Sequence, residues 1–310
     1  MGSIGLALLS MIVMALPLRS DAHASVRTPA RADAEPFGWV VECAFVRHLT
    51  ADPIVYPGQP NQGHLHDFFG NLTTDAFSNY GSLIEGDTTC ALPADTGAYW
   101  VPAAYGSPGL IEPSDADFYY RASTDPTKIR AFPRGLRMIA GDGMATGPQS
   151  LRVIYWDCED GGDDTDRTMP TDCQNGSVSA HVRFPDCWNG VTLDSVNHRR
   201  HMAYSVDGAG AYKVCPATHP VPVPRLIYKL EWPYHDGPTL FLSSGPAFTL
   251  HADFVNSWRQ RKLKSLVRSC LRVVVNCGTF DTDSGRRGPR AGAPSVARTP
   301  EDRVARPGSP

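Results

Sequence analysis

The stretch RLIYKLEW at residues 225–232 sets the fold class, because it is a short apolar run bounded by prolines. Branched and aromatic residues of this kind are enriched in β-strands. Eight similar runs are WVVECAFV (39–46), AYWVP (98–102), DFYYR (117–121), LRMIAG (136–141), LRVIYWDC (151–158), SAHVRFP (179–185), MAYSV (202–206) and TLFLSSG (239–245). Many short strands without long helical segments between them predict a mainly β fold, a single disulfide-bonded β-sandwich or jelly-roll-like domain.

One late segment has helical periodicity instead. In DFVNSWRQRKLKSLVRSCL, residues 253–271, apolar residues recur near a 3.6-residue period. Asp253 lies where an N-cap residue is expected, because its carboxylate can accept a backbone N–H of the first turn. We therefore expect one late α-helix that starts after Asp253, and a weaker helix over Asp75–Ile84.

The two ends of the 310-residue chain differ in composition from its centre. An apolar run followed by Ala22-His23-Ala24 predicts a signal peptide over residues 1–24, with a linker over 25–36. A membrane anchor is the alternative interpretation of that run, and no other run is long enough to cross a bilayer. From Gly278 the chain is rich in Gly, Pro and Arg, which predicts a disordered tail over 278–310. The expected product is a secreted, extracellular β-rich domain over residues 37–277.

Charge and motifs exclude several classes of function. The formal net charge of −3 offers no basic surface for nucleic acid. No Walker loop or dinucleotide fingerprint occurs. Ser243-Ser244-Gly245 lacks the preceding glycine of a nucleophile elbow. The sequence leaves the oligomeric state open.

The eight cysteines all follow the expected cleavage site, and an even number in an exported chain predicts disulfides. Short loops favour the pairs Cys158–Cys173, Cys187–Cys215 and Cys270–Cys277, which leaves Cys43–Cys90. No C-x-x-C pair occurs, so zinc binding by the cysteines is a poor alternative.

Two motifs match the acceptor pattern for N-linked glycans. They start at Asn71, in Asn-Leu-Thr, and at Asn175, in Asn-Gly-Ser. We expect them to matter only in a host that glycosylates.

Histidines gather in four segments that fall mostly in loops or at the ends of elements, where working groups are usually placed. The segments are GHLHDFFG (63–70) with His64, His66 and Asp67, LDSVNHRRHM (193–202) with Asp194, His198 and His201, CPATHP (215–220) with His219, and LHADF (250–254) with His251 and Asp253. Residues two apart in a strand point to one face, so His64 and His66 would present their rings together. His198 and His201 would share a face of one helical turn.

Three functions remain open for these residues. As metal ligands, His64 and His66 would bind Zn²⁺ or Cu²⁺ together with His198, His201 or His251, with carboxylates such as Asp67 orienting the rings. As acids and bases, the histidines would serve a hydrolase or lyase acting on extracellular polysaccharide, because imidazole titrates near neutral pH. A carbohydrate- or surface-binding module would bind without turnover. Candidate sugar-stacking residues are Tyr99, Trp100, Tyr119, Tyr120, Trp188 and Tyr204.

Six phrases in order resemble a family of secreted bacterial and fungal proteins, catalogued as a domain of unknown function, number nineteen ninety-six in that series. The phrases are DPIVYPGQPNQGHLHDFFG, AYWVPAAY, AFPRGLRMIAG, FPDCWNGVTLDSVNHRRHMAY, CPATHPVPVPRL and LHADFVNSW. The resemblance runs from about Pro53 to Cys270 and implies one extracellular domain without an assigned activity. The candidate catalytic residues that match its motifs are His64, His66, Asp67, His198, His201, His219, His251 and Asp253.

Overall fold

The computed structural model describes Gly2 and residues 37–158, 167–170, 172–173, 177–234 and 240–282. Apart from Gly2, the predicted signal peptide (1–24) and linker (25–36) lie outside these residues, as do Asn175 and residues 283–310 of the predicted tail. Across the described ranges, no helix is long and apolar enough to cross a membrane. All described residues except Gly2 belong to one unit, residues 35–310.

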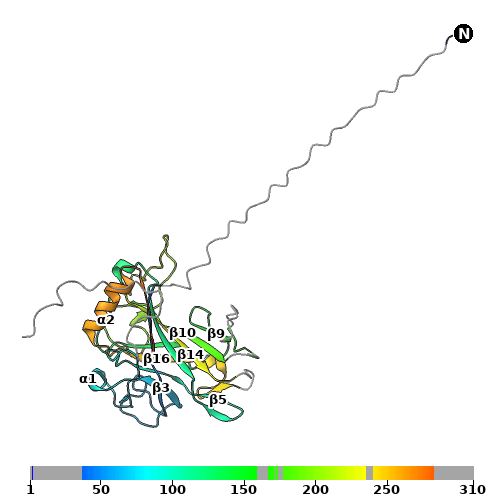
Figure 1. Ribbon diagram of the computed structural model, residues 1–310, viewed down its shortest axis with the longest axis vertical. Coiled ribbons are helices and arrows are strands. Elements are labelled where there is room, and N and C mark those ends of the chain that lie inside the picture. The colour runs from blue at the N-terminus through cyan, green and yellow to red at the C-terminus, as the bar shows by residue number, and fades with distance from the viewer. Residues whose placement is uncertain are drawn as a thin grey trace, which may run out of the picture. The chain divides into compact units, whose positions relative to one another are not determined.

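The first large sheet has six strands in the order β17-β1-β7-β14-β10-β9. Figure 1 labels three of them, β14, β10 and β9. Their bounds are β17 (Asn276–Phe280), β1 (Gly38–Glu42), β7 (Asp115–Arg121), β14 (Arg225–Trp232), β10 (Val178–Arg183) and β9 (Ile154–Cys158). β1 and β17 run parallel, whereas the other neighbours pair antiparallel.

The second large sheet has five strands in the order β2-β3-β4-β16-β8. Their bounds are β2 (Phe45–Leu49), β3 (His66–Gly70), β4 (Ala98–Pro102), β16 (His251–Val255) and β8 (Arg137–Gly141). Two small sheets consist of β12 (Met202–Ala203), β11 (Cys187–Trp188) and β13 (Val221–Pro222), and of β15 (Phe241–Leu242), β5 (Ala104–Gly106) and β6 (Gly109–Ile111).

Aromatic side chains of the two large sheets meet in one core. Tyr99 on β4 lies 4.1 Å from Phe118 on β7 and 5.7 Å from Tyr228 on β14, measured between ring centroids. The opposite face of the five-stranded sheet carries a second cluster, in which Phe68 stacks on Trp100. This two-sheet arrangement with four disulfides confirms the predicted mainly β fold. Three predicted sugar-stacking residues are instead fully buried in these clusters: Tyr99, Trp100 and Tyr120.

The late helix starts later than predicted. Asp253 is not an N-cap residue but lies inside β16, paired with β4 on one side and β8 on the other. The helix α2 spans Gln260–Leu266 and continues as a π-helical segment over Val267–Leu271. The prediction was wrong because every residue of β16 is buried, so its sequence lacks the alternation that marks a half-exposed strand.

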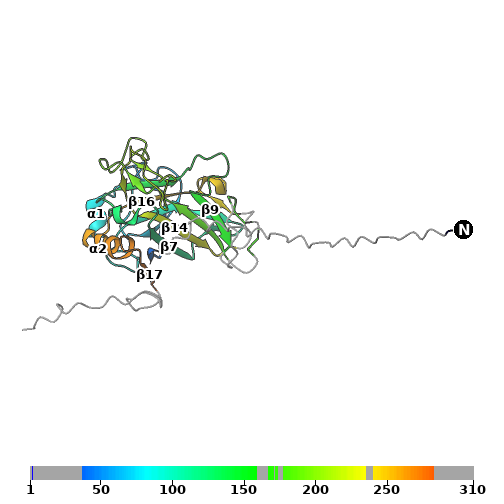
Figure 2. The ribbon, with the colours of Figure 1, turned by 90° about the horizontal axis from the view of Figure 1, so that it is seen from above.

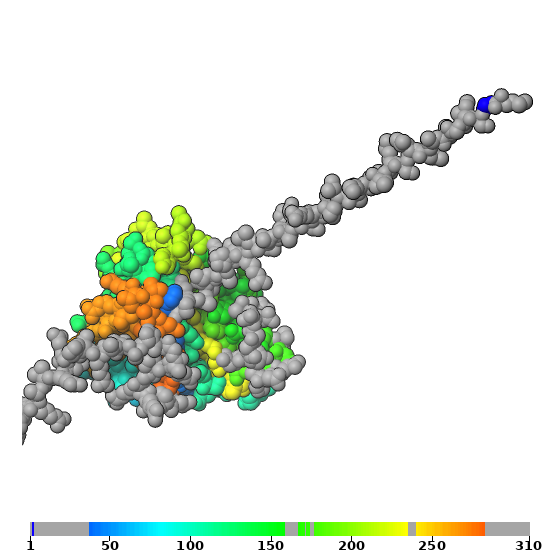
Figure 3. Space-filling view, turned by 45° about the horizontal axis from the view of Figure 1, so that its top comes forward, coloured from blue at the N-terminus to red at the C-terminus, as the bar shows by residue number. Residues whose placement is uncertain are grey.

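The predicted weaker helix is shorter than expected. α1 spans Tyr80–Glu85, and the Asn79 side chain caps it by accepting from the backbone N–H groups of Gly81 and Ser82. Asp75 instead closes a turn, in which its carboxylate accepts the backbone N–H of Phe77. Both α-helices lie at the end of the sandwich away from β9 (Figure 2), and α2 forms part of the surface (Figure 3). Single 3₁₀ turns occur at Pro126–Lys128 and Ala247–Thr249.

Four disulfides cross-link the domain, in the pairs that loop length favours. They join Cys43 to Cys90, Cys158 to Cys173, Cys187 to Cys215, and Cys270 to Cys277. The last one ends at Cys277 inside β17, where Thr279 and Phe280 pair with Val40 and Val41 of β1. The predicted start of the tail at Gly278 is therefore wrong, because β17 extends the folded part to Phe280.

Asn71 is fully buried, and its side chain serves the fold. The amide donates to the carbonyls of Leu83 and Thr96, both at 2.8 Å, and its oxygen accepts the backbone N–H of Thr73 at 2.9 Å. We expect Asn71 to carry no glycan in folded protein from a glycosylating host, as checked by peptide mass mapping. Asn71→Ala should lower the free energy of unfolding in urea by about 2–3 kcal/mol, because buried partners lose their hydrogen bonds. A glycan found on Asn71 of folded protein would contradict this.

Candidate functional site

The five-stranded sheet places His66 and His251 in one row. His66 on β3 pairs with Pro102 on β4, and Asp253 on β16 pairs with Trp100 on the other side of β4. His251 precedes Asp253 by two residues and so stands level with Pro102 as well. Because residues in register share a face, both imidazoles project from the same face of the sheet.

His64, in the loop before β3, completes a histidine triad. Its ring centroid lies 4.3 Å from that of His66 and 5.0 Å from that of His251, and the latter two are 6.0 Å apart. One ligand atom of each residue lies within 4.8 Å of the others. His66 and His251 are buried, whereas His64 is partly exposed. Three of the histidines selected from the sequence thus form one cluster, in which two rings are buried and the third, His64, is partly exposed.

Backbone carbonyls fix the tautomers of two triad rings. His66 Nδ1 lies 2.9 Å from the carbonyl oxygen of Ala51, and His251 Nδ1 lies 3.0 Å from that of Thr249. A carbonyl only accepts, so each Nδ1 donates and each Nε2 keeps its lone pair. A Cβ on Gly143 would lie 3.0 Å from His251 Cε1, so the backbone packs against this ring. Such carbonyl contacts orient histidine ligands in metal sites.

Two carboxylates adjoin the triad. Ligand atoms of Asp52, His66 and Asp253 lie within 4.8 Å of one another, and Asp253 Oδ2 lies 3.9 Å from His251 Nε2. One oxygen of Asp52 accepts the backbone N–H groups of Ile54 and Val55, both at 2.9 Å. Both carboxylate oxygens of Asp253 are buried and lack a hydrogen-bond partner within the described part of the chain, as do Nε2 of His64 and of His66.

Burial favours the neutral forms of these groups. It lowers the pKa of His66 well below the usual value and that of His251 to about 4, and it also lowers the pKa of His64. It raises the pKa of Asp253 well above the usual carboxyl range and raises that of Asp52. Neutral imidazole is the form that binds metal ions, and a dication would favour the ionised carboxylates.

The loop that contains Asp194 and His198 packs against the edge strand β8, and it brings His198 towards the histidine triad. Asp194 forms an ion pair with Arg137 at 3.2 Å and accepts from His198 Nδ1 at 3.0 Å. His198 has a φ of 57°, a conformation that is uncommon outside glycine and that often occurs at functional sites. His198 lies near enough to Asp52 to influence its pKa, and Arg199, which donates to the Gly141 carbonyl at 2.6 Å, lowers the pKa of His251 and that of Asp253 against the raising effect of burial on the latter.

Three predicted site residues have other roles. His201 Nε2 donates to the carbonyl of Arg137 at 2.6 Å, and His219 Nε2 donates to that of Arg200 at 3.0 Å, so both hold the loop in place. Asp67 follows His66 in the strand and points to the opposite face, where it lies 2.6 Å from His48 Nδ1. The prediction that Asp67 orients the rings of His64 and His66 is therefore wrong.

Asp52 and Arg199 lie at the histidine triad, but the sequence analysis did not predict either of them as a site residue. Asp52 opens the phrase that ends in GHLHDFFG, and Asp before Pro is a turn signal. Arg199 stands between His198 and His201. The sequence alone does not show that either residue lies next to β16.

A family model described as "Domain of unknown function (DUF1996)" matches residues 52–258. The matched range starts at Asp52 and contains the triad, Asp253 and the loop with His198. No curated protein and no solved structure is significantly similar to the chain.

Proposed function

The chain belongs to the family described as Domain of unknown function (DUF1996), and because this description assigns no activity, we propose from the site that it binds a divalent transition-metal ion, with Zn²⁺ as the best match. Nε2 of His64, His66 and His251 would bind the ion, and the carboxylate of Asp253 would lie beside it, which leaves one ligand position open. The supporting observation is the convergence of buried nitrogen and oxygen atoms that lack partners within the described residues. Each such atom costs about 1–3 kcal/mol, so a ligand that engages them stabilises the fold.

Ligand chemistry and charge support this choice. Imidazole and carboxylate groups are common zinc ligands, and three imidazoles also suit Cu²⁺. Two ionised carboxylates, Asp52 and Asp253, balance the charge of one dication. The buried site is then neutral overall, which removes most of the desolvation cost of its charges.

We propose that this metal centre is the active site of a hydrolase or lyase that acts on extracellular polysaccharide. A Zn²⁺ ion held by these residues would supply a bound water of lowered pKa. His198 Nε2 is the proton acceptor, because the Asp194 contact leaves it with the lone pair. The positive charge of Arg199 stabilises negative charge that develops beside His251.

The location and substrate class belong to the same proposal. Four disulfides support export, because such bonds persist in oxidising compartments. The polysaccharide substrate follows from the expected secretion. A metal-binding protein without catalytic activity would use the same ligands. The incubation with polysaccharides described below distinguishes these two functions.

Elemental analysis of the gently purified protein tests the metal centre. We expect about one Zn²⁺ per chain, less than a tenth of that in His66→Ala, and an unchanged content in His181→Ala. His181 is a suitable control because it lies on β10, in the other large sheet. Metal at background level in the wild type, or copper in place of zinc, would contradict the choice of ion.

Incubation of the Zn²⁺-loaded protein with a panel of polysaccharides tests turnover. Hydrolysis gives new reducing ends, and elimination gives unsaturated uronides that absorb in the ultraviolet. We expect product from at least one polymer and a loss of about 10²-fold or more in His198→Gln, because general bases contribute rate factors of this size. Metal binding without any product would leave a metal-binding protein.

A further inference from the structure

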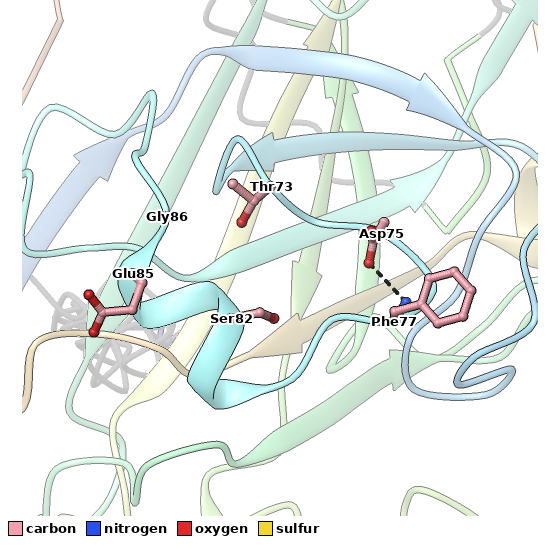
Figure 4. Close-up of a pocket in the computed structure, with 6 residues that line it drawn as sticks. All are labelled: Thr73, Asp75, Phe77, Ser82, Glu85 and Gly86. Carbon is pink, nitrogen blue, oxygen red and sulfur yellow. Dashed lines mark hydrogen bonds between the residues drawn. The ribbon is translucent and has the colours of Figure 1, made fainter.

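A pocket between α1 and the loop after β3 contains no residue of the histidine segments. Its volume is about 400 Å³, within the range of small-molecule sites. Figure 4 shows that Thr73, Asp75 and Phe77 come from the loop after β3, and that Ser82, Glu85 and Gly86 come from α1 and its end.

The lining of the pocket combines one aromatic face with two carboxylates. The Phe77 ring is 63% exposed. One oxygen of Asp75 accepts the backbone N–H of Phe77 at 2.8 Å and the hydroxyl of Ser78 at 3.1 Å, which fixes both the carboxylate and the turn that presents the ring. Glu85 forms no ion pair with a described residue. The pocket has no Lys, Arg or His in its lining, so its charge is negative.

Two loops that contact each other join the edge of this pocket to the segment that carries His64. The backbone N–H of Gly58 donates to the carbonyl of Ala76, the residue before Phe77, at 2.6 Å. Tyr56, two residues before Gly58, is 37% exposed. A Cβ on Gly63 would lie 3.3 Å from the Tyr56 ring, so this ring packs against the residue before His64. The loop of Tyr56 therefore contacts both the segment before Phe77 and the residue before His64.

We propose that the pocket is a subsite for one pyranose unit of an uncharged or amino-sugar glycan. The C–H face of the sugar stacks on Phe77, and its hydroxyl or ammonium groups donate to Asp75, while Glu85 at the end of α1 adds negative charge to the rim. Carboxylates make strong charge-assisted hydrogen bonds with such donors and repel the carboxylates of polyuronates. Tyr56 carries the neighbouring unit towards His64. The inference rests on the proposed function because it specifies the substrate class of that enzyme, and it selects hydrolysis, since elimination requires a uronate.

Calorimetric titration of the full chain with soluble hexasaccharides tests the subsite. The probes are cellohexaose, the glucosamine hexamer and oligogalacturonate. We expect the first or second to bind and the third not to bind. Phe77→Ala should weaken binding by at least tenfold and Glu85→Gln by a smaller factor, whereas Phe241→Ala should leave it unchanged. Phe241 is the matched control, since it is 49% exposed on β15, and thermal unfolding verifies that each variant folds.

The outcomes separate the subsite from the metal centre. Metal-free wild type and His66→Ala should bind the hexasaccharide with the affinity of the Zn²⁺-loaded protein, because the pocket contains no metal ligand. Failure of the metal centre thus leaves this result intact. Tighter binding of oligogalacturonate, equal losses in Phe77→Ala and Phe241→Ala, or no binding of any hexasaccharide at millimolar concentration would each overturn the proposal.

Discussion

Removal of Zn²⁺ is expected to lower the free energy of unfolding by about 4 kcal/mol when the free ion was present at a thousand times its dissociation constant. The folded chain brings ligands from β3 and β16 together, whereas the unfolded chain does not, so binding adds directly to stability. Urea unfolding with and without a chelator measures the difference. Equal unfolding curves in the two conditions would show that the triad holds no structural ion.

Two variants make this measurement specific. His66 belongs to both groups of candidate ligands, the one with His64 and His251 and the one with Asp52 and Asp253. The unfolding of His66→Ala should therefore not respond to Zn²⁺ or to chelator. His181→Ala should respond as the wild type does. A response retained in His66→Ala would assign the ion to another place in the chain.

Raising the pH from about 4 to above 7 is expected to lower the free energy of unfolding by on the order of 4 kcal/mol through Asp95 alone. Asp95 is fully buried, and its carboxylate accepts from the Tyr99 hydroxyl at 2.6 Å. The Tyr99 hydroxyl lies 2.7 Å from that of Tyr120, which accepts from the Trp258 indole N–H at 2.8 Å. Burial raises the pKa of Asp95 to about 7 from the ordinary 3.8.

The sign follows from proton binding. Between pH 3.8 and 7 the folded chain keeps the proton of Asp95, whereas the unfolded chain loses it and is thereby favoured. Stability is therefore full below the unfolded pKa and is lost as the pH rises through the folded pKa. Asp67 and Asp117, with pKa values raised by burial to about 8 and about 6, contribute with the same sign.

Comparison of the wild type with Asp95→Asn isolates this effect. Urea unfolding at several pH values between 4 and 8 should give a shallower decline in the variant, because asparagine does not titrate and still offers a side-chain oxygen to the backbone N–H of Gly97. Parallel declines in the two proteins would show that Asp95 is ionised in the fold throughout this range.

The sequence predicted the fold class because most strands can be recognised from their own residues. AYWVP and RLIYKLEW coincide with β4 and β14, which are short and bounded by Pro or Gly. β16 was assigned to a helix because burial on both faces removed its alternation. The order of the strands could not be predicted, since pairings such as β1 with β17 join residues more than two hundred positions apart.

The same limit applies to the site. Residue type and local clustering were enough to select His64, His66, His251 and Asp253, and spacing alone predicted that the first two rings would lie together. Their meeting with His251 depends on β3 and β16 both pairing with β4, which no local pattern encodes. Asp67 was misassigned because adjacent residues in a strand face opposite ways.

The parallel pairing of β1 with β17 bears on how the domain is synthesised. The last described strand lies beside the first, so the six-stranded sheet is completed only after Phe280 has left the ribosome. Until then β1 has a free row of backbone N–H and C=O groups on that side, a template for self-association. A nascent or truncated chain that stops at Leu271 should therefore aggregate, even though every residue of the histidine cluster has already been made.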